Sequence, residues 1–238
     1  MRYYLCFLLA GAVLLVIFVR EKIKAYSVGA LFWKTAVSVM FMAAGVAAAW
    51  SVPKNAEAGE FCWFVLGGLL FGLLGDIWLD LKYVYPQDDA KYTYAGFTVF
   101  SIGHILFMAG MLRHYAAAVQ PIYVIAPLAA GVVLGVGNGF LGPVMKLQFG
   151  RFKGIVMFYG SILFAMMLLA GSLALSFGFQ NGTLNWMFAG GILFAVSDLI
   201  LSQTYFGHDH EKPIDIILNY IFYYGAQFAI AASLLFIR

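Results

Sequence analysis

Two aspartates, Asp76 and Asp198, interrupt long apolar stretches of this 238-residue chain. A short carboxyl side chain at such a position cannot extend to water, and burying an ionisable group inside a membrane-spanning helix costs about 2.5–3.5 kcal/mol on insertion scales. Such groups usually face the interior of a helix bundle. Two carboxyl groups in one water-poor site can provide a proton donor and a carboxylate together, as in glycosidases. The pair therefore indicates acid–base chemistry.

Other polar side chains within apolar runs are weaker candidates. Lys34 either binds an anion or extends its apolar stem to the lipid headgroups, and His104 either relays a proton or makes an interhelical hydrogen bond. Asp80, one helical turn after Asp76, is expected at the membrane edge in a structural role, as a cap or paired with Lys82. The uncharged candidates are Tyr159, Ser197, Asn219, Tyr223, Tyr224 and Gln227.

The sequence lacks the motifs of nucleophilic, metal-assisted and nucleotide chemistry. It contains no nucleophile elbow, zinc-binding His-Glu-x-x-His, P-loop or dinucleotide fingerprint. His208 and His210 have a metal-like spacing but lie in a charged loop, where we expect them to be solvated. Cys6 and Cys62 lie in apolar runs and are interpreted as small apolar residues rather than as a disulfide. We therefore expect no metal and no cofactor.

The composition places these residues in a membrane. The chain is 63% hydrophobic and 11% charged, whereas soluble domains are roughly 45–50% apolar and about 25% charged. A globule of this size cannot bury so much apolar surface. An appended soluble domain, a nucleic-acid-binding module and a disordered chain are excluded, and the net charge of +3 is too small to indicate a polyanionic partner. We expect residues 1–238 to form one polytopic membrane domain.

Eight apolar runs are long enough for spanning helices, which need about 20 residues. They lack the alternation of membrane β-strands. The predicted fold class is therefore an all-α integral membrane protein, an eight-transmembrane-helix bundle. The first run follows only Arg2 and has no small-residue cleavage site, so it is expected to be a retained helix. The predicted helices cover 3–19, 28–50, 61–80, 95–112, 119–137, 152–172, 183–201 and 214–236.

Basic residues predict the orientation, because cytoplasmic loops are enriched in Lys and Arg. Nine lie in the first, third, fifth and seventh loops: Arg20, Lys22, Lys24, Lys82, Lys91, Lys146, Arg151, Lys153 and Lys212. Four lie on the opposite side: Arg2, Lys54, Arg113 and Arg238. Both termini should therefore face away from the cytoplasm, in a bacterial cytoplasmic membrane or, for a eukaryotic chain, in the endoplasmic reticulum membrane.

The polar residues share one depth. At about 1.5 Å per residue, Lys34 lies about 10 Å from the cytoplasmic end of its helix, and Asp76 and Asp198 about 5–7 Å from theirs. On the same rise, the residues about 8–14 Å deep are His104, Tyr159, Asn219 and Tyr223. This common depth predicts a polar cavity that opens toward the cytoplasmic leaflet.

Two patterns concern how the helices pack. Residues 68–79 align without gaps on residues 190–201, which indicates a 4+4 internal repeat of parallel halves; chance similarity between apolar segments is the alternative. Small residues at four-residue spacing predict close helix approach. They are Gly68 and Gly72 in one run, and Gly131, Gly135 and Gly139 in another.

Several short patterns follow one another in a fixed order: Gly75-Asp76, Gly103-His104, Ser197-Asp198, and Tyr223-Tyr224 followed by Gln227. Together they resemble the YhhN-like lysoplasmalogenase family of eight-helix membrane proteins, over about residues 30–230. Tyr159, with Ile162 and Met166, is similar to the sixth-helix pattern of that family. In one departure, Thr35 follows Lys34 where family members often carry proline.

The resemblance implies hydrolysis of the vinyl ether bond of lysoplasmalogens, with Asp76 and Asp198 as the catalytic pair. The products would be a fatty aldehyde and a glycerophospho-head group. Vinyl ethers hydrolyse by protonation of the β-carbon, followed by addition of water to the resulting oxocarbenium ion, so the reaction needs an acid and a carboxylate but no metal. We expect Asp198 to be the acid, because its neighbours Val196 and Leu199 are more apolar than Gly75.

Other polar residues would support the two aspartates, and two other functions are alternatives to hydrolysis. Lys34 would hold the lipid phosphate and His104 would tune or relay the proton. Tyr223, Tyr224 and Gln227 would position water or the ether oxygen. The expected partners are a lysophospholipid and the bilayer. A proton-coupled transporter would also suit intramembrane Asp and His residues, whereas a non-catalytic lipid-binding protein would leave the aspartate pair unexplained.

Overall fold

The computed structural model describes residues 1–24, 27–52, 56–207 and 212–237. These residues form eight long helices joined by short turns, with no strand among them, and all eight helices are long and apolar enough to cross a membrane. The chain is thus an integral multi-pass membrane protein, as predicted. The helices are α1 (Arg2–Lys24), α2 (Val28–Trp50), α3 (Ala56–Val84), α4 (Asp89–Tyr115), α5 (Ile122–Leu141), α6 (Lys153–Ser176), α7 (Gly182–Phe206) and α8 (Pro213–Ser233).

Most helices extend beyond their apolar runs. α1 continues to Lys24 through a charged segment that was expected to be a break, and α3 covers Ala56–Val84 rather than 61–80. Backbone hydrogen bonds keep a helix intact beyond the hydrocarbon layer, so the end of an apolar run does not mark the end of the helix. α5 likewise runs through the Gly137–Gly139 segment that was expected to end it.

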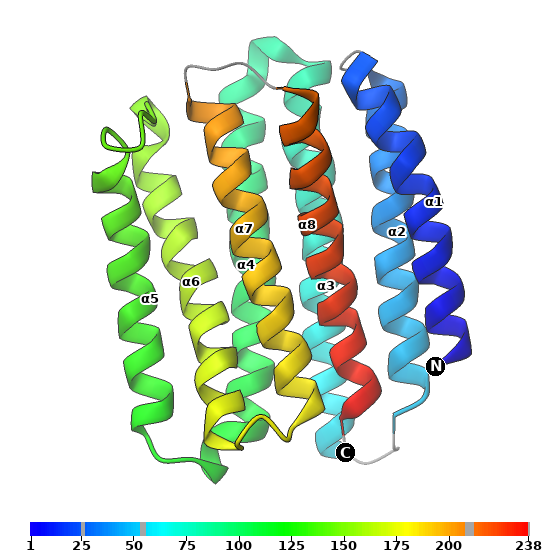
Figure 1. The fold of residues 1–238 in the computed structure, drawn as a ribbon, viewed down its shortest axis with the longest axis vertical. Coiled ribbons are helices and arrows are strands. Elements are labelled where there is room, and N and C mark those ends of the chain that lie inside the picture. The colour runs from blue at the N-terminus through cyan, green and yellow to red at the C-terminus, as the bar shows by residue number, and fades with distance from the viewer. Residues whose placement is uncertain (25–26, 53–55, 208–211, 238) are drawn as a thin grey trace.

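Six helices form a ring. α2, α3, α4, α6, α7 and α8 pack in that order, and α8 closes the ring against α2. α1 packs outside the ring on α2 and α8, and α5 packs on α6 (Figure 1). Both termini lie at one end of the bundle (Figure 1). We call the opposite end, where α1 meets α2, α3 meets α4, α5 meets α6 and α7 meets α8, the far end.

Close helix approach at the predicted glycines is confirmed. A Cβ on Gly131 or Gly135 of α5 would overlap the backbone of Ala165 or Ser161 on α6. A Cβ on Gly68 of α3 would overlap the Phe107 ring of α4. The α5–α6 pairs let the helix backbones approach closely, whereas Gly68 leaves room for a side chain of α4. Nothing in the arrangement tests the internal repeat, which stays a prediction.

The N-terminal half of α2 is regular despite the departure at position 35. The Ser27 side chain caps the helix by accepting a hydrogen bond from the Ala30 amide at 3.2 Å. Thr35, in place of proline, donates its hydroxyl to the Leu31 carbonyl at 2.9 Å. The uninterrupted helix presents Lys34 and Ser38, four residues apart, on one face.

The cysteines are free, as expected. Cys6 is exposed on α1 and Cys62 is buried in α3. Lys54, Arg238, His208 and His210 lie outside the described residues, so the expectation that the two histidines are solvated stays a prediction.

Candidate functional site

A cavity in the far-end half of the ring brings the two predicted aspartates together. We call it the central cavity; Asp76 of α3 and Asp198 of α7 both line it, and all six ring helices contribute to its wall. The other lining residues are Lys34, Leu79, Phe97, Phe100, Tyr159, Phe194, Ser197, Leu201, Tyr205, Asn219, Tyr220 and Tyr223. Except for His104, the residues of the polar layer expected from residue depth therefore line one cavity.

Asp76 is held on several sides. Its side chain lies deep, with 1% of the residue exposed. Its Oδ2 accepts hydrogen bonds from the Ser38 hydroxyl at 2.6 Å and from the Tyr223 hydroxyl at 2.8 Å. The Lys34 ammonium lies 3.3 Å from Oδ1. An ionised carboxylate offers about four acceptor positions, so three donors fix this group and leave room for one more hydrogen bond.

Asp80 is buried and belongs to the same charge network, which corrects the expectation of a membrane-edge residue paired with Lys82. Its two oxygens accept hydrogen bonds from Lys22 and Lys34, each at 2.9 Å. Lys34 therefore bridges Asp76 and Asp80 and does not extend to the headgroups. Lys22, which was assigned to a loop, is a buried residue of α1. Buried charges persist when they are paired, and here two lysines neutralise two aspartates.

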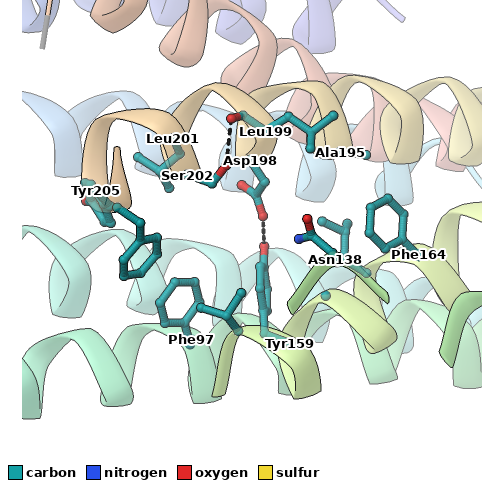
Figure 2. A pocket seen from close by; sticks show the side chains of 14 residues that line it. Phe97, Asn138, Tyr159, Phe164, Ala195, Asp198, Leu199, Leu201, Ser202 and Tyr205 are labelled. Atoms are coloured by element: carbon teal, nitrogen blue, oxygen red, sulfur yellow. Dashed lines mark hydrogen bonds between the residues drawn. The ribbon is translucent and has the colours of Figure 1, made fainter. Parts of the chain in front are cut away.

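Asp198 has a different environment. It is half-buried, and the Tyr159 hydroxyl of α6 donates a hydrogen bond to its Oδ2. Figure 2 shows the two side chains pointing toward one another. No ion pair joins Asp198 to a cation within the described ranges.

A second cavity connects Asp198 with the side of the bundle. We call it the lateral crevice; residues of α4, α5, α6 and α7 line it, mostly apolar ones such as Leu163, Phe164 and Ala195 (Figure 2). Leu199 lines it as well and is 41% exposed on the outer surface. The crevice shares five wall residues with the central cavity: Phe97, Tyr159, Asp198, Leu201 and Tyr205. Asp198 thus stands where a lipid-facing crevice meets the polar interior.

Three predicted residues on α8 connect the elements around the aspartates. Asn219 donates to the Ser197 carbonyl at 2.8 Å and so joins α8 to α7 beside Asp198. Gln227 donates to the Tyr223 hydroxyl at 3.0 Å, and Tyr224 donates to the Lys34 carbonyl at 3.1 Å. Gln227 and Tyr224 are not part of either cavity wall, so they support the partners of Asp76 and do not reach the cavity.

His104 is the exception among the predicted residues. It is 1% exposed, and neither ring nitrogen has a hydrogen-bond partner in the part of the chain that the structure describes. The interpretation as an interhelical hydrogen-bonding residue is therefore wrong. The ring packs edge-on against Phe194 at 4.6 Å and lies 5.8 Å from the Tyr159 ring, centroid to centroid.

Sequence reasoning missed two residues that complete the network, Ser38 and Lys22. Ser38 had a usable signal, because it follows Lys34 by four residues and therefore shares its helix face. Lys22 had none, since its pairing depends on how the end of α1, which packs on α2 and α8, brings Lys22 to Asp80 of α3. Among the residues described, no group of three or more His, Cys, Asp or Glu side chains could hold a metal ion.

Comparison with known proteins gives one match. A family model described as the YhhN family matches residues 29–234, which is most of the chain. No curated protein and no solved structure matches.

Proposed function

The chain belongs to the YhhN family, which includes lysoplasmalogenases, and we propose that it hydrolyses the vinyl ether bond of lysoplasmalogens in the membrane. One observation carries the proposal: two carboxyl groups with unlike environments, Asp76 and Asp198, line one cavity. Vinyl ether hydrolysis needs two such groups in different protonation states.

Asp198 is the proposed proton donor. A carboxyl group in an apolar site without a cation is favoured in its neutral form, because an unpaired buried charge is costly. The Tyr159 hydroxyl occupies Oδ2, which leaves Oδ1 to carry the proton. Asp198 is also the aspartate that an incoming lipid meets, since it lines the lateral crevice.

Asp76 is the proposed carboxylate. The Lys34 ammonium and the hydroxyls of Ser38 and Tyr223 stabilise its negative charge. Its remaining acceptor position is suited to a water molecule. Fixed in this way, the carboxylate would stabilise a developing oxocarbenium ion and accept a proton from water.

The proposed reaction passes through an oxocarbenium ion and a hemiacetal. Asp198 Oδ1 gives its proton to the β-carbon of the vinyl ether, the carbon–carbon π bond breaks, and the positive charge is shared between the α-carbon and the ether oxygen. Water adds to the α-carbon while Asp76 takes one of its protons, which gives a hemiacetal. The hemiacetal then collapses: its carbon–oxygen bond to glycerol breaks and its hydroxyl proton passes to the glycerol oxygen, which gives a fatty aldehyde and the glycerophospho alcohol. Transfer of a proton from Asp76 to Asp198 restores both aspartates.

The lateral crevice offers a place for the hydrocarbon chain. Its wall beyond Asp198 is apolar, with Leu163, Phe164 and Ala195 on α6 and α7. These residues lie deeper in the membrane than Asp198, because α6 and α7 run in opposite directions from the far end. A lipid whose vinyl ether lies at Asp198 would extend its chain along this wall, in the direction in which chains lie in a bilayer.

The test is an assay of purified protein with alkenyl and acyl lysophospholipids. We expect aldehyde release from the alkenyl lipid and no fatty acid release from the acyl lipid. Because general acid–base groups contribute about 10²–10⁴-fold in rate, Asp198→Asn and Asp76→Asn should each lower kcat at least about 100-fold. Glu60→Gln, the same change at an exposed carboxylate paired with Arg113, is the matched control and should keep full activity.

Two outcomes contradict the proposal. Full activity of Asp198→Asn would exclude the two-aspartate mechanism. Absence of aldehyde release from any alkenyl lipid, together with proton-dependent flux in liposomes, would favour a transporter.

A further inference from the structure

Lys82 is a far-end cation that the charge network leaves out. Its ammonium group lies 3.2 Å from the centroid of the Tyr205 ring and 5.0 Å from that of Tyr83. It forms no ion pair with any carboxylate among the described residues. Asp89, the acidic residue at the start of α4, is paired with Arg151 at 3.6 Å. Lys82 therefore has donor capacity that no carboxylate uses.

The other lysines near the central cavity are already neutralised. Lys34 lies 3.3 Å from Asp76 and 2.9 Å from Asp80, and Lys22 lies 2.9 Å from Asp80. An anionic ligand at Lys34 would have to compete with two buried carboxylates and would be repelled by both. The sequence-based assignment of a phosphate to Lys34 is thus unfavourable on charge grounds. Lys82 also feels the negative charges of Asp89 and Asp80, but it forms no ion pair with either of them.

Lys82 is also in the right place for a headgroup. Lys82 is not itself a wall residue of either cavity, but Tyr205, whose ring it covers, lines both the central cavity and the lateral crevice. Along α7, Tyr205 lies seven residues closer to the far end than Asp198, which is about 10 Å at 1.5 Å per residue. In a lysoplasmalogen, seven covalent bonds separate the phosphorus from the β-carbon, about 8 Å on the scale of three bonds per 3.3–3.6 Å. The lipid span is about 2 Å shorter than the rise along α7, a difference that one hydrogen-bond distance between phosphate and ammonium group covers.

We propose that Lys82 binds the phosphate group of the lysophospholipid substrate at the far-end mouth of the cavities, beside Tyr205, while the vinyl ether lies at Asp198. The site rests on the proposed function for the identity of its lipid. The three N–H donors of the ammonium group face a phosphate that accepts charge-assisted hydrogen bonds. The ligand would lie along α7, with its phosphate near the membrane surface and its chain toward the membrane centre.

The experiment measures binding and so does not depend on turnover. The full chain is reconstituted in nanodiscs and titrated with a 1-O-alkyl lysophospholipid, whose saturated ether cannot react, and in parallel with 1-O-alkylglycerol, which lacks the phosphate. Lys82→Gln should raise the Kd of the phospholipid about tenfold or more, as loss of a hydrogen bond between charged groups predicts. It should leave the Kd of the alkylglycerol unchanged, and Lys82→Arg should retain most of the phospholipid affinity.

The matched control is Lys91→Gln, which removes a positive charge from the same end of the bundle. Lys91 is exposed and paired with Asp88 at 2.6 Å, so its loss should leave both Kd values unchanged. An unchanged phospholipid Kd in Lys82→Gln would overturn the proposal. An equal loss of affinity for both ligands would also overturn it, because it would mean that Lys82 has a structural role. If inorganic phosphate displaced the phospholipid and bound with the same affinity as the lipid, the site would be assigned to free phosphate instead.

The binding result also separates this proposal from the proposed function. If the wild-type chain releases no aldehyde but Lys82→Gln raises the Kd of the phospholipid and not that of the alkylglycerol, the hydrolase proposal fails and the phosphate site stands. If aldehyde is released and Lys82→Gln binds both ligands normally, the phosphate site fails and the hydrolase proposal stands.

Discussion

Asp76 and Asp198 differ in what surrounds them, and the proposed mechanism rests on this difference. Asp76 accepts two hydroxyl hydrogen bonds and lies beside the Lys34 ammonium, whereas Asp198 has the Tyr159 hydroxyl and no ion pair within the residues described. Equivalent carboxylates would compete for one role. Unequal ones divide the roles of acid and base between them.

Tyr159→Phe tests whether the hydroxyl orients Asp198. The change keeps the ring in the cavity wall but removes the hydrogen bond, so Asp198 should lose its fixed proton-donating geometry. A hydrogen bond of this class is worth about 1–3 kcal/mol, which predicts a roughly 5- to 150-fold lower kcat for aldehyde release with a smaller change in KM. Tyr94→Phe, which removes a hydroxyl that donates to the Arg151 carbonyl, should leave both constants unchanged. A normal kcat in Tyr159→Phe would mean that the hydroxyl does not position the acid.

Asp80→Asn tests the buried charge network. The amide would leave Lys22 without its carboxylate partner and Lys34 with Asp76 alone, and an uncompensated buried charge destabilises by about 3–5 kcal/mol. We expect a clearly lower midpoint of thermal unfolding in detergent. Replacing Lys22 by Met in the same chain removes the orphaned charge and should restore a large part of the loss. A double variant as unstable as Asp80→Asn alone would contradict the network.

Residue types predicted the aspartate pair but not its partners. Asp76 and Asp198 stand out because a carboxyl group in an apolar run is costly to bury in a membrane and is usually functional. One ion pair of Asp80 depends on Lys22, which the local sequence assigns to a loop, and on the packing of α1 against α2 and α8, which brings Lys22 to Asp80. The unpartnered ring of His104 was likewise hidden, because hydrogen bonding depends on neighbours from α6 and α7. Side chains within one helix were predictable, whereas contacts between helices were not.

At the scale of elements, the α5–α6 contact supports one wall of the crevice. Gly135 lies against the backbone of Ser161, where a side chain has no space. Gly135→Val should push α5 away from α6 and destabilise the bundle by about 1–3 kcal/mol, the range of overpacking in a close contact. Thermal unfolding in detergent measures the effect. Gly137→Ala, in the same helix with no atom near its added Cβ, should be neutral or slightly stabilising. Equal destabilisation by both variants would mean that the contact between Gly135 and Ser161 does not explain the effect.

The helices themselves were largely predictable, because eight apolar runs have no other stable arrangement in a bilayer. Their ends were not. Charged residues such as Lys22 and Lys24 looked like loop punctuation but extend α1 past the apolar run. The small residues of α5 looked like a turn at Gly137–Gly139, yet Gly139 faces Met157 of α6 inside a continuous helix. Composition predicts which segments span, while packing decides where they stop.

At the scale of the whole molecule, the ring of six helices surrounds the two aspartates on which the proposed function rests. The central cavity lies within the ring, and the lateral crevice leads from it toward the outer surface between α6 and α7. A substrate that is itself a membrane lipid would reach Asp198 sideways and would not need to leave the bilayer. The orientation of the bundle in the membrane therefore determines from which leaflet the lipid enters.

The orientation can be measured directly. Nine basic residues cluster at the far end, all of them among the described residues, and the opposite end holds four in the sequence. The positive-inside tendency therefore predicts that the far end, both cavities and Lys82 lie on the cytoplasmic side. In a bacterial host, alkaline phosphatase fused after position 238 should be active and a green fluorescent protein at the same position should be dark. The same two reporters fused after Gly207, between α7 and α8, should give the opposite pattern. A fluorescent C-terminal fusion would instead place the cavities in the outer half of the membrane, where the substrate would have to come from the non-cytoplasmic leaflet.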